Sequence, residues 1–228
     1  MDTKDYAKKH HYLPVFYQNG FTDIDGRIWR HDIRKSVTVS HTPKNIGYEK
    51  HLYTVDFPGQ PPDALEKKLS ALESLIAPIL RETLNTRILP IGDALFLLIE
   101  FVALSFARTP TMQTVFDAHA CGLSGQDINF SSVPKLLNKN NKALQMTKLM
   151  YDAFELLRQR KWQLVIIPDE LGSLVTCDNP VKTQWMYERD QVYGYPILSV
   201  CRTWVYSKRS INPICKIVVK AGRLCRGR

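Results

Sequence analysis

The chain has 228 residues, enough for one large domain or for a domain with an extension, and its 44% hydrophobic and 23% charged residues are typical of a globular protein. None of its five cysteines forms a CxxC pair, which argues against a disulfide framework and a structural zinc site. Eight of the 31 basic residues lie from Ser199 onward, where there is no acid, so the net charge of +9 belongs to the C-terminal end rather than to a binding face of the whole domain.

The first residues lack the features of a targeting or membrane segment. Residues 1–9 are mostly polar or charged, without the apolar stretch of a secretory signal. No apolar run reaches the roughly 18 residues that cross a bilayer, so no membrane span is expected. We therefore expect residues 1–9 to be a flexible arm and the protein to be cytoplasmic, with reduced thiols.

The N-terminal region favours short strands. Aromatic and apolar residues crowd the segment 12–17, and Pro14 suits a sheet edge or a bend. After an Asp-Gly turn at 25–26, the segments 27–31 and 35–39 have strand character. We predict a small antiparallel β-meander here.

Helical periodicity follows a proline-rich break at residues 57–62. Asp63 and Glu66 have the spacing of a capping box, and apolar residues then recur at helical intervals until Pro78, which should kink or end the helix. Between residues 93 and 108 nearly every side chain is apolar. A helix without a polar face is buried on all sides, so this segment is predicted to be the central helix of the core.

The remaining elements complete the fold class. Helices are predicted over 111–119 and 138–160, and an antiparallel hairpin over 162–176. The pattern predicts an α+β fold, with a mainly helical core around the buried central helix and small antiparallel β elements. We assign residues 10–198 to a single domain and 199–228 to an atypical basic tail.

Several blocks resemble one protein family in order. Residues 11–17 (HYLPVFY) are similar to the HYxPxFYLxxF opening of the bacterial family known as domain of unknown function 4238. Residues 25–29 resemble its next strand, 108–110 (RTP) its mid-chain block, and 176–181 (TCDNPV) its TSDNPV block. The agreement extends over about residues 10–198. The resemblance brings no settled activity with it.

The resemblance ends at Ser199. Members of the family usually continue with more strand material, whereas this chain continues with an acid-free sequence rich in Cys, Arg and Lys. We hypothesise that the residues from about Val200 are a frameshifted or otherwise aberrant end. Resequencing of the locus tests this idea, because an intact frame with related proteins sharing the tail would contradict it.

His11 is the first candidate site residue. A histidine beside Tyr12 at a strand start is usually structural, but an imidazole can also serve as a base or ligand near neutral pH. The same imidazole opens the block that resembles the family. The neighbouring His10 is expected at the surface.

Glu100 and Arg108 are the anomalies of the predicted central helix. A carboxylate on a buried helix is costly unless it is paired, hydrogen-bonded or protonated. Glu100 is therefore either part of a structural pair or a pKa-shifted acid, base or metal ligand. Arg108 is either a cation at the helix C-terminus or an anion clamp.

Asp178 lies in a predicted turn at residues 177–180. A hydrogen bond to the local backbone is the ordinary role of such a residue, and a ligand or base is the alternative. Cys177 is rejected as a nucleophile, because an adjacent negative charge raises the pKa of a thiol. Trp29 and Trp162 are expected in the core.

Three functional hypotheses remain open, and the sequence leaves open whether the protein is an enzyme. In the first, His11, Glu100 and Asp178 converge in a hydrolase-like site, where a divalent metal would fit, and Arg108 binds an anionic, phosphodiester-like substrate. In the second, the protein is a non-catalytic interaction or regulatory module whose motif residues hold the β elements on the central helix. In the third, the basic tail binds nucleic acid.

Overall fold

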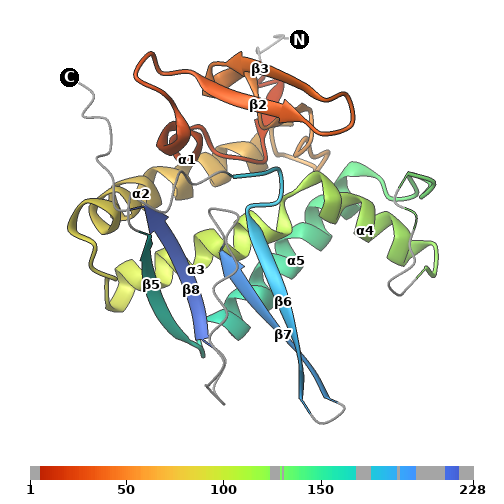
Figure 1. The fold of residues 1–228 in the computed structure, drawn as a ribbon. Coiled ribbons are helices and arrows are strands. Elements are labelled where there is room, and N and C mark those ends of the chain that lie inside the picture. The colour runs from red at the N-terminus through yellow and green to blue at the C-terminus, as the bar shows by residue number, and fades with distance from the viewer. Residues whose placement is uncertain are drawn as a thin grey trace.

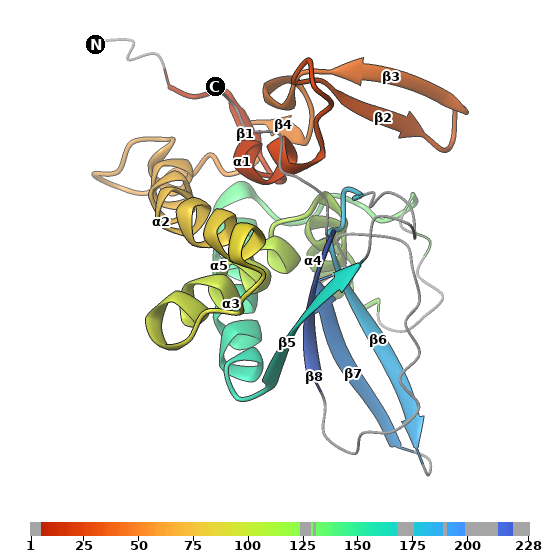
Figure 2. The ribbon, with the colours of Figure 1, turned by 60° about the vertical axis from the view of Figure 1, so that its left-hand side comes forward.

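Three parts make up the structure, a computed structural model that describes residues 6–123, 129, 131–167, 176–188, 191–198 and 214–220. A layer of helices forms the middle. Short N-terminal strands lie over one end of this layer, and a four-stranded sheet lies along its side (Figures 1 and 2). The fold is α+β, as the sequence predicts.

The predicted helices are confirmed. They are α2 (Ala64–Thr86), α3 (Gly92–Ala107), α4 (Pro110–Ala120) and α5 (Lys139–Leu157). Helix α3 packs against α2, α5 and the sheet, and its side chains from Leu98 onward are nearly all buried. An apolar surface on every side must be covered on every side, which places α3 at the centre of the core.

The capping box expected at the start of α2 is not formed, and of the two outcomes expected at Pro78 an early end of the helix is excluded. No capping box forms, because the Asp63 side chain makes no cap hydrogen bond and instead pairs with Lys67 at 3.0 Å. The helix also continues through Pro78 to its end at Thr86. Pro78 is exposed while Ile76 is fully buried, so core packing holds the helix across the hydrogen bond that proline cannot make.

The N-terminal block, residues 9–50, differs from the predicted meander. It contains β1 (Lys9–His11), α1 (Val15–Gln18), β2 (Ile28–Asp32), β3 (Val37–His41) and β4 (Tyr48–Lys50), with 3₁₀ turns at Asn19–Phe21 and Pro43–Asn45. Strand β1 pairs antiparallel with β4, and β2 pairs antiparallel with β3. The block therefore has two separate two-stranded sheets instead of one continuous meander.

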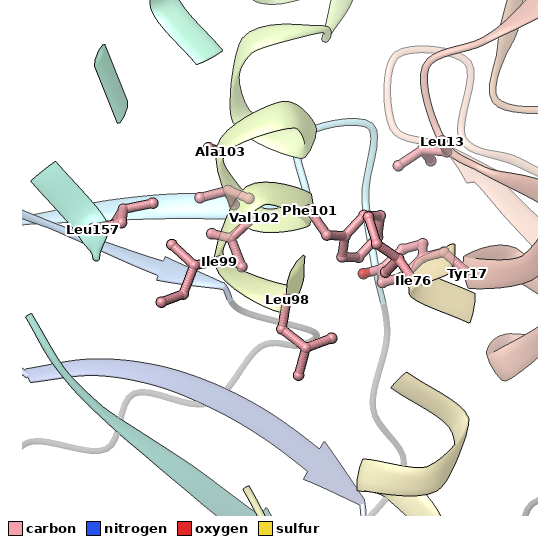
Figure 3. Packing of buried hydrophobic residues seen from close by; sticks show 10 residues of the cluster. Leu13, Tyr17, Ile76, Leu98, Ile99, Phe101, Val102, Ala103 and Leu157 are labelled. Atoms are coloured by element: carbon pink, nitrogen blue, oxygen red, sulfur yellow. The ribbon is translucent and has the colours of Figure 1, made fainter. Parts of the chain in front are cut away.

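Helix α1 occupies the segment that was predicted as a strand. Pro14, with φ −59°, is its N-cap residue, and the helical turn directs two aromatic rings onto α3. The ring centroids of Phe16 and Tyr17 lie 5.4 and 6.0 Å from that of Phe101, and Figure 3 shows Tyr17 beside Phe101. Contacts with α3, rather than strand pairing, thus determine the local conformation.

The larger sheet lies beside α3 and α5 (Figure 2). Its strands are β5 (Lys161–Ile167), β6 (Val181–Glu188), β7 (Gln191–Leu198) and β8 (Ile214–Lys220), in the order β5-β8-β7-β6. Strands β6 and β7 form an antiparallel hairpin, while β8 runs parallel to both β5 and β7.

This topology differs from the antiparallel hairpin that was predicted over residues 162–176. Strand β5 pairs in parallel with β8, a strand that the sequence did not suggest. The predicted second strand falls largely on residues 168–175, outside the described part of the chain. Strand β8 lies within the segment 199–228 that was assigned to a basic tail.

No single helix among the described residues is long and apolar enough to cross a membrane. Helices α3 and α4 taken together have the length and apolar composition of a membrane span, but the pair is bent by 61°.

Candidate functional site

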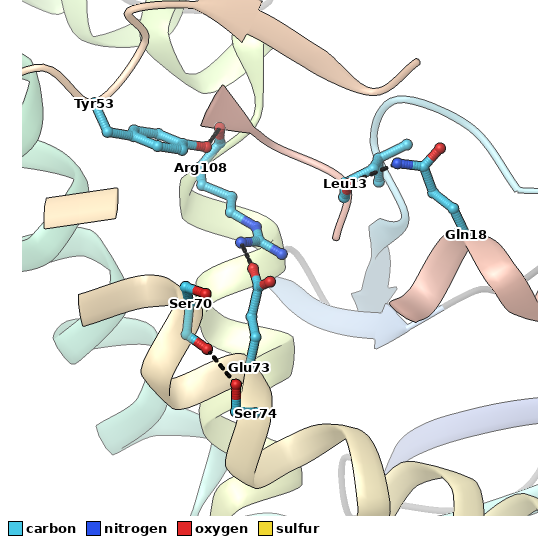
Figure 4. Close-up of polar contacts among 7 residues, drawn as sticks. All are labelled: Leu13, Gln18, Tyr53, Ser70, Glu73, Ser74 and Arg108. Carbon is cyan, nitrogen blue, oxygen red and sulfur yellow. Dashed lines mark hydrogen bonds and ion pairs between the residues drawn. The ribbon is translucent and has the colours of Figure 1, made fainter. Parts of the chain in front are cut away.

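Arg108 is a fully buried cation where α3 ends and the N-terminal block meets the helices. Its side chain has 0% exposure. The Nη1 atom lies 2.6 Å from Oε1 of Glu73 on α2, and the Tyr53 hydroxyl donates a 3.0 Å hydrogen bond to the Arg108 carbonyl oxygen (Figure 4). Two elements other than its own thus position this arginine.

One edge of the Arg108 guanidinium has no protein partner. Within the described residues, its buried Nε and Nη2 atoms make no hydrogen bond. These two nitrogens form the side edge of the planar group, which matches two oxygens of a carboxylate or phosphate. A buried cation with unsatisfied donors is costly, so this edge is a candidate anion-binding position.

Glu66 is the acidic group of this site that sequence analysis missed. It lies two helical turns from Glu73 on the same side of α2, and its buried Oε2 has no partner in the described part of the chain. Burial and then the Glu73 charge raise the pKa of Glu66 to about 7, while Arg108 and a hydrogen bond from the His11 backbone oppose the rise. Glu66 is therefore poised to exchange a proton near neutral pH.

His11, at the end of β1, faces the same cluster. Its ring lies against Tyr48, at a centroid distance of 5.5 Å. Burial lowers its pKa below the ordinary value of 6.5, a hydrogen bond to the Lys44 backbone opposes this, and the charge of Arg108 adds to the lowering. The buried Nε2 has no partner among the described residues. Because a carbonyl can only accept, Nδ1 is assigned as the donor to Lys44, which leaves Nε2 with a free lone pair.

His10 is buried, contrary to the expectation that it lies at the surface. Its Nδ1 accepts a 2.8 Å hydrogen bond from the Tyr53 backbone N–H, and Nε2 donates to the Ala7 carbonyl at 2.9 Å. The imidazole also stacks on the Tyr53 ring. Successive residues of a strand point to opposite sides, so His10 anchors β1 while His11 faces the site.

Gln18 and Gly47 make further contacts that hold the N-terminal block together. The buried Gln18 Nε2 donates to the carbonyl oxygens of Leu13 and Ile46, at 2.7 and 3.2 Å (Figure 4). Gly47 has φ +65°, and a Cβ there would lie 2.8 Å from Gln18 Nε2. The backbone of β1 is thereby held in place beside α2.

Glu100 lies apart from this cluster along α3, whereas Asp178 acts on Tyr12, the residue next to His11. Glu100 is half-buried, and burial alone raises its pKa; it lies about 12 Å before Arg108 along the axis, since a helix rises about 1.5 Å per residue. Asp178 is exposed in a bend, where its charge helps burial to raise the pKa of Tyr12 to about 12. That bend contacts α1, because the Tyr17 hydroxyl lies 2.9 Å from Thr176 Oγ1.

The predicted three-residue convergence is not found as a metal-binding group. No set of three His, Cys, Asp or Glu side chains that could hold a metal ion occurs in the described residues, which include His11, Glu100 and Asp178. The structure instead brings His11 and Arg108 together with Glu66. A signal for Glu66 existed, since it precedes Glu73 by seven residues along the mostly apolar face of α2, but its capping-box spacing offered a sufficient local explanation.

Comparison with known proteins gives one match. The family model described as "Protein of unknown function (DUF4238)" matches residues 9–196. Neither a curated protein nor a solved structure matches the chain. The matched region contains β1, α2 and α3, and hence His11, Glu66 and Arg108. Because the match spans well over half of the 228 residues, the chain belongs to the DUF4238 family.

Proposed function

We propose that the protein is a hydrolase that acts on an anionic, phosphodiester-like substrate, with Arg108 as anion clamp, His11 as general base and Glu66 as general acid. The observation that carries this proposal is the Nε and Nη2 edge of the buried Arg108, which has no hydrogen-bond partner among the described residues, together with a histidine whose pKa burial lowers and a glutamate whose pKa burial raises to about 7. A cation and an acid–base pair are a sufficient set for hydrolysis of a charged ester.

The proton transfers follow from the two pKa shifts. Neutral His11 accepts a proton from water at Nε2 as the water oxygen attacks phosphorus. Protonated Glu66 donates its proton to the leaving oxygen as the ester bond breaks, and the products are a phosphomonoester and an alcohol. The imidazolium then returns its proton through solvent to the Glu66 carboxylate, which restores the starting state.

Access to Arg108 requires a movement of β1. The guanidinium is fully covered, and its charge acts on both His11 of β1 and Glu66 of α2. Within the described residues β1 pairs only with β4, over three residues. Opening this strand breaks its pairing with β4 and the contacts of His10 with Tyr53 and Ala7, and we infer that substrate enters between β1 and α2 when these contacts are broken.

The test uses bis(4-nitrophenyl) phosphate as substrate. His11→Gln and Glu66→Gln should each lower turnover by roughly 10²–10⁴-fold, the usual contribution of an acid or base. Glu82→Gln, an exposed change on the same helix, is the matched control and should keep wild-type turnover. Wild-type turnover in both site variants would overturn the proposal.

The pH dependence gives a second readout. Turnover should rise as pH increases through the lowered pKa of His11, because the base must be neutral, and fall above about 7, because Glu66 must be protonated. If the chain hydrolyses no phosphodiester and the variants only lower the melting temperature, the non-catalytic interaction module is supported instead.

We further infer a bacterial, cytoplasmic protein. Cys121 and Cys177 are free thiols, as is usual in a reducing compartment. Metal participation and catalytic roles for Glu100 and Asp178 remain predictions. Incubation with Mg²⁺ or Mn²⁺ and assay of Glu100→Gln and Asp178→Asn would test them.

A further inference from the structure

The β2–β3 hairpin carries three planar side chains in a row on one face. Arg27, Trp29 and His31 alternate along β2 and its approach, so they point to the same side of the two-stranded sheet. All three are exposed, and Trp29, expected in the core, is 63% exposed. An exposed tryptophan between two other planar side chains is a candidate surface for binding a planar ligand.

Each member of this row is held by a hydrogen bond. Arg27 Nε donates to Ser40 Oγ at 2.9 Å, and its Nη2 donates to the Ser40 carbonyl at 3.0 Å. The Trp29 indole donates to Asp23 Oδ2 at 3.1 Å, and His31 Nδ1 lies 2.9 Å from Thr38 Oγ1. The side chains are therefore ordered before any ligand binds, which lowers the entropy cost of binding.

The opposite face of the hairpin is covered by the body near Ile28, while Val37 and Val39 on that face are 48% and 45% exposed. Ile28 is buried there, and Arg30, on the same face, is close enough for its charge to lower the pKa of Tyr12 against the larger effect of burial. The row formed by Arg27, Trp29 and His31 thus lies on the free face. Figures 1 and 2 show the hairpin projecting from the rest of the molecule.

Two acidic side chains of the hairpin, Asp23 and Asp32, are engaged in its turns. Asp23 accepts hydrogen bonds from the backbone of Asp25 and Arg27, and Asp32 accepts from the backbone of Arg34 and Lys35. The side chains of Arg34 and Lys35 are exposed beside the row. Basic groups are therefore available to an anionic partner.

We propose that this row binds single-stranded nucleic acid. Alternate residues of a strand lie about 6.8 Å apart, twice the roughly 3.4 Å spacing of stacked bases, so Trp29 and His31 can each take one unstacked base while Arg27 meets a phosphate. Unpaired bases are required, because a duplex covers the faces that would stack. The proposal is independent of the catalytic site and concerns binding alone.

Fluorescence anisotropy of the full chain with a labelled twelve-nucleotide oligothymidylate tests the proposal. Trp29→Leu keeps an apolar side chain but removes the aromatic face, and should weaken binding roughly 5- to 150-fold, the range of one stacked base. Trp29→Phe should retain most of the affinity. Circular dichroism of each variant checks that the fold is intact.

A matched pair of variants tests how much charge contributes to nucleic-acid binding. Arg27→Ala should lower the slope of log affinity against log salt by about 0.7, the value for one phosphate contact of a single strand. Arg30→Ala removes the same charge from the opposite face of the same strand and should leave affinity and slope close to wild type.

Three results would overturn the proposal. The first is equal binding by Trp29→Leu and wild type, and the second is loss of binding only when Arg223, Arg226 and Arg228 are neutralised, which would assign binding to the tail. The third is the absence of oligonucleotide binding together with Trp29-dependent binding to phosphatidylserine vesicles, which would assign the face to a membrane surface.

Discussion

Glu66 shows how one buried carboxyl makes stability depend on pH. Its pKa is about 7 in the folded chain, against 4.5 for the ordinary group, so between these values the folded state binds more protons than the unfolded state. The contribution of Glu66 is then fully present below about pH 4.5 and is lost as pH rises through 7. We expect the free energy of unfolding to fall by on the order of 3 kcal/mol over this range.

Urea unfolding at pH 5 and pH 8 measures this effect. Glu66→Gln removes the titrating group, so it should be more stable relative to wild type at pH 8 than at pH 5. Glu82→Gln, on the exposed part of α2, should show the pH dependence of wild type. A Glu66→Gln variant that keeps the full wild-type pH dependence would contradict the assignment.

Single residues also show how far a sequence indicates a site. Arg108 and His11 were identifiable because each is an exception to its local pattern, a cation that ends an apolar helix and an imidazole at a strand start. Glu66 was not, since its capping-box position offered a sufficient local explanation. The burial of His10 and the exposure of Trp29 depend on which face of a strand meets the helices, and neither face is marked by its own residues.

At the level of elements, Gly47 is a position in the N-terminal block where an added Cβ would clash with neighbouring side chains. Gly47 and Gly59 both have positive φ, +65° and +76°, so alanine at either position costs about 1 kcal/mol. Only at Gly47 would the new Cβ meet other atoms, Gln18 Nε2 at 2.8 Å and the Leu13 Cβ at 2.9 Å. We expect Gly47→Ala to cost a further 1–3 kcal/mol or so from overpacking.

Chemical denaturation of the two alanine variants separates clash from backbone strain. Gly59→Ala, with nothing within 4 Å of its Cβ, reports the strain alone. Equal losses of stability in the two variants would mean that the contact between Gly47 and Gln18 contributes nothing.

The sequence predicted well those elements whose conformation depends on neighbouring residues in the chain. Helix α5 follows from the periodicity of its apolar residues and α3 from its nearly unbroken apolar run, and the N-cap side chains of Thr109 and Asn138 accept backbone hydrogen bonds in α4 and α5. Helix α1 was mistaken for a strand because its aromatic residues are explained by contact with Phe101, far along the chain. The pairing of β5 with β8 is likewise a long-range contact that periodicity does not reveal.

For the whole molecule, β8 makes the C-terminal segment part of the sheet. It pairs along the full length of β5 and also contacts β7. Ending the chain at residue 213 should therefore lower the melting temperature and promote aggregation, because β5 would lose its pairing with β8 and β7 would become an open edge. Neutralising Arg223, Arg226 and Arg228 should leave the melting temperature unchanged.

Differential scanning calorimetry of both variants decides between a structural segment and a dispensable tail. An unchanged melting temperature after truncation would agree with the hypothesis of an aberrant end. A large fall would mean that residues 214–220 are required by the fold, whatever the origin of the sequence around them.

The hydrogen bond between Tyr17 and Thr176 joins residues 159 positions apart, which has a consequence for folding during synthesis. At about 5–20 residues per second, the ribosome needs roughly 8–30 s to make the second partner after the first. The aromatic side chains of α1 leave the ribosome before Phe101 and the 176–180 bend exist. During that interval they are exposed apolar surface, and the N-terminal block is where we expect a nascent chain to need a chaperone.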